Sequence, residues 1–139
     1  MTSDFVVISC GKKKAQTRAV ASRLYTSTQF KCTLTYALSI ARRERVRVLS
    51  AKHGLLKLAD VLEPYDCTWG DAGCISTETV AKQVASESEA RWLLFMPKHY
   101  CEFFELVVPD AIRIKPRNVN MFTLCSWTRA HLGKVICCE

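Results

Sequence analysis

Three consecutive lysines end a small-residue turn that follows a short apolar segment near the N-terminus. The segment reads Phe5-Val6-Val7-Ile8, and the turn after it reads Ser9-Cys10-Gly11-Lys12-Lys13-Lys14. Because glycine admits backbone conformations that other residues avoid, the amides of such a turn can converge on one anion while the lysines supply charge. The pattern predicts a buried strand that ends in a phosphate-binding loop. The alternative is a solvated basic turn after an edge strand.

A second apolar segment leads into a similar turn. The segment Val46-Arg47-Val48-Leu49-Ser50 has the composition of a strand, and Ala51-Lys52-His53-Gly54-Leu55-Leu56 follows it. The turn again combines small residues, a cation and a glycine. Since loops at the carboxyl ends of parallel strands are where open α/β sheets bind ligands, the two turns are expected to share one edge of a sheet.

Residues 57–75 have no clear periodicity and contain Pro64, Gly70 and Gly73, which interrupt regular elements. We expect an ordered surface loop that carries the block Leu62-Glu63-Pro64-Tyr65-Asp66. Long loops in compact domains are often functional.

Helical and strand patterns alternate along the rest of the chain, which predicts parallel βαβ units. The expected helices run from Thr28 to Ala41, from Ser76 or Thr77 to about Ala90, from Pro97 through the inward stripe Tyr100, Phe103, Phe104 and Val107, and from Val119 to Leu132. The further expected strands are Trp92–Met96 and Ala111–Lys115. The predicted fold is a single α/β domain over residues 1–139, a three-layer sandwich around a mostly parallel sheet of about four strands.

The net charge of +7 is distributed unevenly along the 139 residues. Residues 1–57 contain twelve Lys or Arg and two acids, whereas residues 58–111 contain three and ten. The basic residues Arg113, Lys115 and Arg117 alternate and would share one face of a strand. Two basic segments that converge favour an anionic partner, a nucleic acid or a nucleotide, over a merely soluble basic surface.

Composition also excludes several classes of protein. No apolar run reaches the roughly 18 to 20 residues that span a bilayer, and the first residues lack the features of a secretory signal, so we expect no membrane association and a cytoplasmic location. The eight cysteines include no Cys-x-x-Cys pair and are expected to be reduced thiols. The cluster Cys125, His131, Cys137 and Cys138 matches no structural zinc spacing, so neither a metal nor a cofactor is expected.

Taken in order, four blocks resemble those of a known family. They are Ser9-Cys10-Gly11-Lys12-Lys13, Leu24-Tyr25-Thr26-Ser27, Ser50–Leu56 and Pro64-Tyr65-Asp66. The chain resembles a small group of phage and bacterial proteins of unknown function, and is similar in outline to YaaA-like DNA-binding proteins and to the middle domain of archaeosine synthase. The resemblance covers residues 5–66 and implies a uracil-DNA-glycosylase-like fold with chemistry at a nucleobase N-glycosidic bond.

Each block then receives an expected role. Cleavage of a glycosidic bond builds positive charge on the sugar, and Asp66 is the carboxylate expected to stabilise that charge or to orient water. Tyr65 is expected to hold the base or to orient water, and His53 to assist departure of the base. In the alternative, Tyr65 packs in the protein and Asp66 caps a turn. The expected binding residues are Ser9, Cys10, Gly11, Lys12, Lys13, Tyr25, Ser27, Ser50, Lys52 and Gly54.

Three functions fit these residues. The first is an N-glycosidase that acts on a nucleotide in nucleic acid, the second a non-catalytic nucleic-acid-binding module, and the third an enzyme that acts on a free nucleotide. All three need one geometric condition. The Pro64–Asp66 block must fold over the two turns, with the carboxylate of Asp66 near Lys12, Lys52 or His53.

Overall fold

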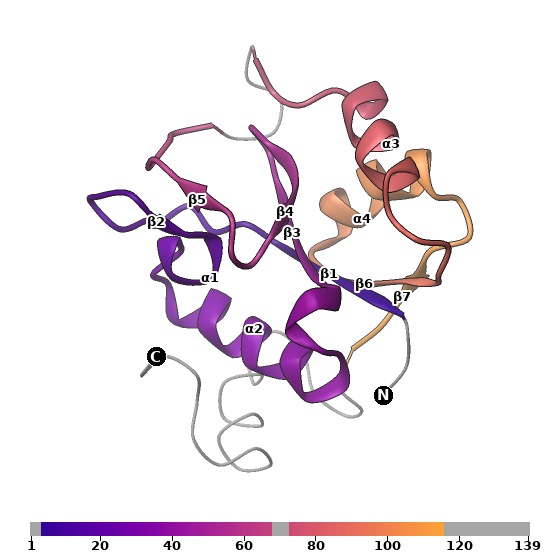
Figure 1. Ribbon diagram of the computed structural model, residues 1–139, viewed down its shortest axis with the longest axis horizontal. Coiled ribbons are helices and arrows are strands. Elements are labelled where there is room, and N and C mark those ends of the chain that lie inside the picture. Colours follow the sequence, from indigo (N-terminus) through magenta and orange to yellow (C-terminus); the bar gives the residue numbers. More distant parts are fainter. Residues whose placement is uncertain (1–3, 68–72, 116–139) are drawn as a thin grey trace.

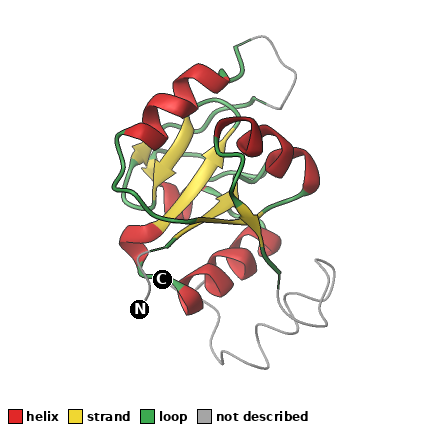
Figure 2. Ribbon diagram, turned by 90° about the vertical axis from the view of Figure 1, so that its right-hand side faces the viewer, coloured by secondary structure: helices red, strands yellow, loops and turns green. Residues whose placement is uncertain are grey.

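The computed structural model describes residues 4–67 and 73–115, which form a central sheet with helices on both faces (Figures 1 and 2). The strands of the sheet, in spatial order, are β4 (Gly54–Lys57), β3 (Val46–Ser50), β1 (Phe5–Ser9), β6 (Trp92–Phe95) and β7 (Ile112–Arg113). Strands β3, β1, β6 and β7 run parallel, and β4 pairs antiparallel with β3. The predicted α/β class with a mostly parallel sheet is confirmed. The sheet has one strand more than expected.

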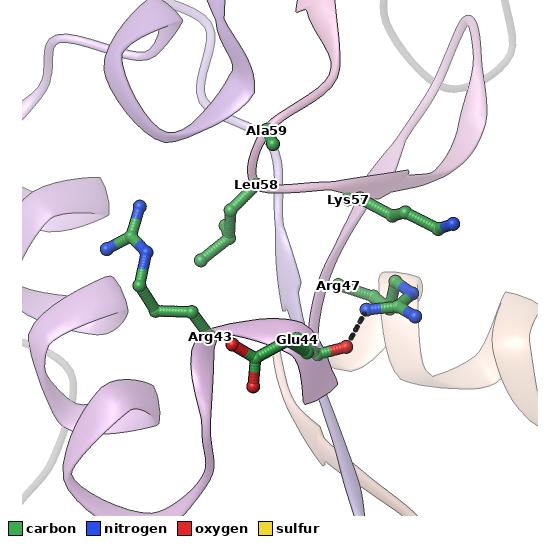
Figure 3. Close-up of a pocket in the computed structure, with 6 residues that line it drawn as sticks. All are labelled: Arg43, Glu44, Arg47, Lys57, Leu58 and Ala59. Atoms are coloured by element: carbon green, nitrogen blue, oxygen red, sulfur yellow. Dashed lines mark hydrogen bonds between the residues drawn. The ribbon is translucent and has the colours of Figure 1, made fainter.

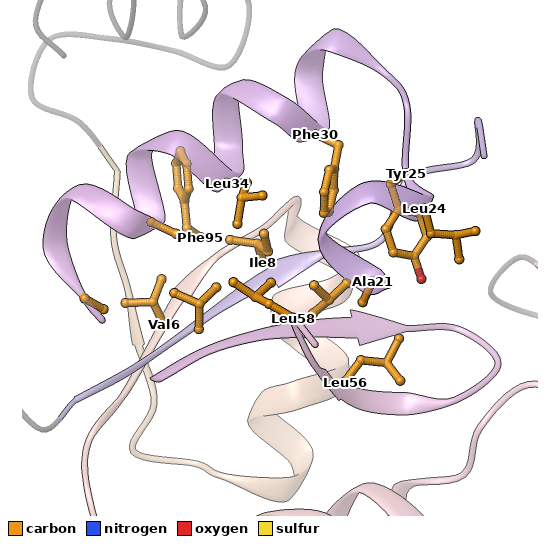
Figure 4. Packing of buried hydrophobic residues seen from close by; sticks show 14 of the residues in the cluster. Val6, Ile8, Ala21, Leu24, Tyr25, Phe30, Leu34, Leu56, Leu58 and Phe95 are labelled. Carbon is orange, nitrogen blue, oxygen red and sulfur yellow. The ribbon is translucent and has the colours of Figure 1, made fainter. Parts of the chain in front are cut away.

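Strand β1 lies at the centre of the sheet and is buried on both faces. Val6 and Ile8 pack in the cluster that α2 (Thr28–Ile40) covers (Figure 4), whereas Phe5 and Val7 pack in the cluster on the opposite face. That second cluster includes residues of α3 (Thr77–Ala85) and α4 (Lys98–Val107). Because successive strand residues point to opposite faces, a strand covered on both sides requires an uninterrupted apolar run. This explains the composition of residues 5–8.

Strands β3 and β4 form a hairpin that was not anticipated. Leu49 pairs with Leu55 and Ser50 pairs with Gly54, so the expected loop Ala51–Leu56 is confined to its first three residues. Gly54 begins β4 with φ of 76°, a conformation that favours glycine, and the tight turn allows the next leucines to pair back along β3. Only this added edge strand makes the sheet mixed.

The expected loop over residues 57–75 is also partly ordered into a strand. Strand β5 (Val61–Leu62) pairs antiparallel with β2 (Ala19–Val20), which directly precedes the short helix α1 (Ala21–Leu24). The amide of Ala21 donates to the carbonyl of Asp60 at 2.8 Å. The chain segment that leads to Tyr65 is therefore tied to the segment that leads to Tyr25.

The helices begin near the predicted residues but differ at their ends. The N-cap of α2 is Ser27, not Thr28, because the Ser27 Oγ accepts a hydrogen bond from the Phe30 amide at 3.1 Å. Helix α3 ends at Ala85, short of the expected Ala90. Beyond it the chain turns, and the Glu87 carboxylate accepts a 2.8 Å hydrogen bond from the buried Arg47.

The predictions for the part of the chain after β6 are confirmed in part. Helix α4 follows Pro97 as expected, and a 3-10 turn, η1 (Arg43–Arg45), precedes β3. The expected last strand shortens to β7, where Arg113 forms an ion pair with Glu105 at 2.7 Å. Arg117 and the expected helix over residues 119–132 lie outside the described residues. No helix in the described part of the chain has the length and apolar character needed to cross a membrane.

Candidate functional site

The order of the strands reverses direction at β1, which creates a topological switch point at the carboxyl edge of the sheet. From β1 the chain passes through α2 to β3 on one side, and it later returns to β6 on the other side of β1. In open α/β sheets, ligands bind in the crevice outside the carboxyl ends of the strands at such a reversal. Here the crevice lies between the turn after Ser9 and the turn after Phe95.

A pocket of about 310 Å³ occupies this position. The turn after β1, the first turns of α2 and the start of α4 line it. Its residues are Ser9, Cys10, Gly11, Lys12, Lys13, Ser27, Gln29, Phe30, Thr33, Pro97 and Tyr100. Six of the sequence-predicted binding residues therefore border one cavity.

Backbone hydrogen bonds hold the lysine-bearing turn against β3 and against the chain that enters α2. The Cys10 amide donates to the carbonyl of Leu49 at 3.1 Å, and the Thr26 amide donates to the carbonyl of Lys13 at 3.0 Å. Lys12 and Lys13 are exposed, so their ammonium groups are accessible to an anion at the pocket. Charge and a held backbone thus occur together at this turn, and its binding of phosphate stays a prediction.

The expected role of Gly11 needs a correction. Its φ is not positive; among the described glycines only Gly54 and Gly73 have positive φ. A Cβ built on Gly11 would lie 3.5 Å from the Ser27 Oγ and 3.5 Å from the Tyr25 Cβ, which is ordinary van der Waals contact. The turn therefore does not depend on a glycine-only conformation.

Three hydroxyl groups form a hydrogen-bonded chain beside the pocket. The Tyr65 hydroxyl lies 2.7 Å from the Ser50 Oγ and 2.5 Å from the Tyr25 hydroxyl. The Ser50 Oγ already accepts hydrogen bonds from the amides of Lys52 and His53, each at 3.1 Å. With both lone pairs used, Ser50 donates its own proton to Tyr65, and Tyr65 in turn donates to Tyr25. The chain fixes the Pro64–Asp66 block onto the β3–β4 turn.

Burial raises the pKa of both tyrosine hydroxyls above the usual 10, so both are protonated at neutral pH. It raises the pKa of Tyr25 to about 12, and the hydrogen bond from Tyr65 offsets part of that rise. Burial raises the pKa of Tyr65 as well, and negative charge on Cys10 and on Tyr25 would raise it further. Both groups therefore act as neutral hydrogen-bonding phenols.

The surroundings of the Tyr65 ring favour the alternative in which this residue packs within the protein. The Lys14 Nζ lies 4.3 Å from the ring centroid, and the His53 ring meets the Tyr65 ring edge-on with centroids 5.0 Å apart. Tyr25 is 1% exposed, so its hydroxyl is covered as well. Neither tyrosine is among the residues that line the pocket, and the contact of either ring with a base stays a prediction.

His53 stays uncharged near neutral pH. Burial lowers its pKa from the usual 6.5, and the positive charge of Lys52 lowers it further. Its backbone carbonyl accepts a hydrogen bond from the Gln83 Nε2 at 3.0 Å, while the Gln83 Oε1 accepts from the Leu55 amide at 2.8 Å. A side chain of α3 thus braces the turn that carries Lys52 and His53. The neutral imidazole can act as a base or as a hydrogen-bond partner, but it is poorly suited to act as an acid.

Asp66 follows the anchored Tyr65 along the chain. The residue is exposed, and among the described residues no hydrogen bond or ion pair joins its carboxylate to Lys12, Lys52 or His53. The predicted folding of the Pro64–Asp66 block onto the Ser50–Gly54 turn is observed through Tyr65. That the Asp66 carboxylate lies within reach of Lys12, Lys52 or His53 stays a prediction.

Another pocket, of about 390 Å³, lies where β3 begins and β4 ends (Figure 3). The side chains of Arg43 and Lys57 point to opposite sides of Leu58, so the two charges do not converge. Arg47 is already bonded to Glu87 and to the carbonyl of Glu44. This pocket contains none of the predicted site residues and offers no focused anion site.

The sequence did not lead us to expect that helices α2 and α4 line part of the 310 Å³ pocket. Gln29 and Thr33 come from α2, and Tyr100 comes from α4, where its hydroxyl lies 3.4 Å from the Cys10 Sγ. Pro97, two residues after the end of β6, was an available signal, since it places the start of α4 at the same edge as the lysine turn. Lys14, which contacts Tyr65, was the third lysine of the motif but was not assigned to the site.

The structure contains no metal-type cluster in its described ranges, 4–67 and 73–115, because no three His, Cys, Asp or Glu side chains gather there. The Cys125, His131, Cys137 and Cys138 set lies outside those ranges. Within them, the Cys67 and Cys74 sulfurs lie 3.9 Å apart.

Comparison with known proteins places the chain in a family. Residues 5–119 match the model of the family of unknown function DUF6884, and the chain belongs to that family. No curated protein and no solved structure matches it. The matched range includes the lysine turn, the Ser50–Gly54 turn, Asp66 and Tyr100, so the whole described site lies within the segment that defines the family.

Proposed function

We propose, for this member of a family of unknown function, that it binds a nucleotide unit of nucleic acid through its phosphate and cleaves the bond between base and sugar. Phosphate binding is the part with the strongest support. The observation that carries it is the pocket at the switch point, where Lys12 and Lys13 stand beside the first turn of α2. Helix N-termini and lysines both favour anions.

The proposed reaction is hydrolysis of an N-glycosidic bond. Asp66 would stabilise the positively charged sugar or orient water, and His53 would hydrogen-bond the departing base. Tyr65 supports this role because its hydroxyl group makes two hydrogen bonds. These bonds hold Tyr65, the neighbour of Asp66 in the chain, at the edge of the sheet that carries the pocket. An exposed carboxylate is accessible to a substrate that covers the edge from outside.

The proposal includes a distant relation to the YaaA-like proteins, the archaeosine synthase middle domain and the uracil-DNA-glycosylase fold. The blocks that include Lys12, Lys52 and Tyr65 suggest it. It also includes a cytoplasmic location, where nucleic acid and nucleotides are available to a basic domain.

A non-catalytic binding module is the second candidate. The observation in its favour is that Asp66 has no ion pair with Lys12, Lys52 or His53 among the described residues. In that case the lysines alone would bind the phosphates, and Asp66 would be a solvated loop residue without a catalytic role.

Salt dependence tests the phosphate site. Replacing Lys12 and Lys13 together with alanine should weaken binding to an oligonucleotide. For each phosphate that the variant no longer neutralises, the magnitude of the log-log salt slope should fall by roughly 0.7 to 0.9. Lys57→Ala is the matched control, since Lys57 is equally exposed but lines the other pocket. An unchanged slope in the double variant would place the phosphate site elsewhere.

Mass spectrometry of released bases tests the reaction. The protein is incubated with modified and unmodified nucleosides, nucleotides and oligonucleotides, and free base is measured. Asp66→Asn should abolish release while oligonucleotide binding persists, whereas Glu63→Gln, an exposed acid in the same loop, should retain both. Binding without any release by the wild-type protein would establish the binding module instead.

A further inference from the structure

We infer that the pocket takes a single nucleotide unit, with its phosphate at the lysine turn, its base stacked on Tyr100, and Gln29 determining which base is preferred. This inference rests on the proposed function, and it assigns residues that none of the sequence motifs contain. It follows from the division of the pocket into two chemically different walls.

One wall carries charge and backbone. It consists of the turn after β1, with Lys12, Lys13 and the polar groups of Ser9 and Ser27. The rest of the lining comes from α2 and the start of α4 and carries aromatic rings, a proline and an amide; its residues are Gln29, Phe30, Thr33, Pro97 and Tyr100. Nucleotides have the same division, because an anionic phosphate is joined through the sugar to a flat, partly apolar base.

Tyr100 is held where a base would lie. Its hydroxyl is 3.4 Å from the Cys10 Sγ, so the ring begins directly beside the lysine turn. Its backbone lies in the first turn of α4, whose next turn is fixed in the core by Cys101 and Phe104. A half-buried aromatic ring that borders a basic cavity is the usual platform on which a base stacks.

Gln29 supplies hydrogen bonds of both kinds. It is exposed in the first turn of α2, and its amide offers donors and an acceptor at the rim of the pocket. Amide side chains discriminate bases by matching the donors and acceptors along a base edge. Stacking on Tyr100 supplies affinity for any base, and Gln29 supplies the preference.

The volume of the pocket limits the ligand to one unit. About 310 Å³ is near the lower end of the roughly 300 to 1,000 Å³ that small-molecule sites occupy. A stacked base pair does not fit in such a cavity. A nucleotide within a duplex must therefore be turned out of the stack to enter, and single-stranded or free nucleotides are the preferred ligands.

Calorimetric titration with two kinds of probe distinguishes the residues that contact the phosphate from those that contact the base. Ribose 5-phosphate carries the phosphate and sugar alone, and the four nucleoside 5′-monophosphates add a base. Tyr100→Ala should weaken binding of every nucleotide about tenfold and leave ribose 5-phosphate unchanged. Leu106→Ala is the control, because Leu106 is exposed on α4 and is not among the residues that line the pocket.

Two further variants distinguish the loss of a contact with the base from a folding defect. Tyr100→Phe keeps the ring and should retain nucleotide binding within about twofold, since stacking needs only the ring. Gln29→Ala, at an exposed position, should leave ribose 5-phosphate binding unchanged and reduce the spread of affinities among the four nucleotides.

The outcomes that would overturn the inference are distinct. Equal losses for ribose 5-phosphate and nucleotides in Tyr100→Ala, with Gln29→Ala leaving base preference unchanged, would show that neither residue contacts the base. Wild-type protein that binds neither kind of probe nor an oligonucleotide would refute the proposed function and this inference together. Wild-type protein that binds ribose 5-phosphate as tightly as nucleotides would refute the inference alone.

Discussion

Removing one hydroxyl group from Tyr65 should destabilise the folded protein by about 2 to 3 kcal/mol. Tyr65→Phe keeps the ring and deletes the oxygen that bonds both the Tyr25 hydroxyl, at 2.5 Å, and the Ser50 Oγ, at 2.7 Å. Each hydrogen bond contributes about 1 kcal/mol net, and an unsatisfied buried partner adds to the loss. Tyr25 is 1% exposed and Ser50 is fully buried, so water cannot replace the missing oxygen.

Urea unfolding followed by circular dichroism measures this change, and the corresponding decrease in Tm is about 8 °C. A double-mutant cycle with Tyr25→Phe isolates the bond between the two phenols. We expect a coupling free energy of about 1 kcal/mol, because the two hydroxyls contact each other directly.

The reasoning is refuted if Tyr65→Phe changes the free energy of unfolding by less than about 0.5 kcal/mol and the two substitutions are additive. That result would mean that the three hydroxyls do not hold the Pro64–Asp66 block on the β3–β4 turn. The position of Asp66 would then need another explanation.

Two other substitutions test the turn that carries Lys52. Gly54→Ala should cost about 1 to 3 kcal/mol in urea unfolding, since its φ of 76° disfavours a side chain and the new Cβ would collide with the Gln83 amide. Gly11→Ala, where a Cβ meets only ordinary contacts, should cost clearly less, and equal losses would contradict the reasoning. His53 has a folded pKa below its unfolded value of 6.5, so the unfolded state binds the proton more readily. The contribution of its neutral form is complete above pH 6.5 and is lost as the pH falls through the lower, folded pKa. Wild-type protein should therefore lose more stability than His53→Gln on acidification from about pH 7.5 to 5.5, and parallel profiles would show that His53 is not the titrating group.

Local patterns in the sequence were sufficient to predict most of the elements. The apolar run before Ser9, the helical spacing after Ser27 and the proline that precedes α4 each depend on a few adjacent residues. Such signals are local because strands and helices bury faces with fixed periods of two and about 3.6 residues. The shared edge of the two basic turns also followed, since parallel strands present their carboxyl ends together.

The contacts that complete the site depended on the tertiary structure. Tyr25 and Tyr65 are forty residues apart, and Cys10 and Tyr100 are ninety apart, yet each pair is within hydrogen-bonding distance. These contacts follow from the strand order, in which β6 lies next to β1, and from the pairing of β2 with β5. No periodicity within a segment specifies which segments become neighbours, because that choice depends on how all the apolar faces pack together. For the same reason the sequence predicted the Pro64–Asp66 block at this edge, and only the packed structure decided that Tyr65 points inward while Asp66 faces the solvent.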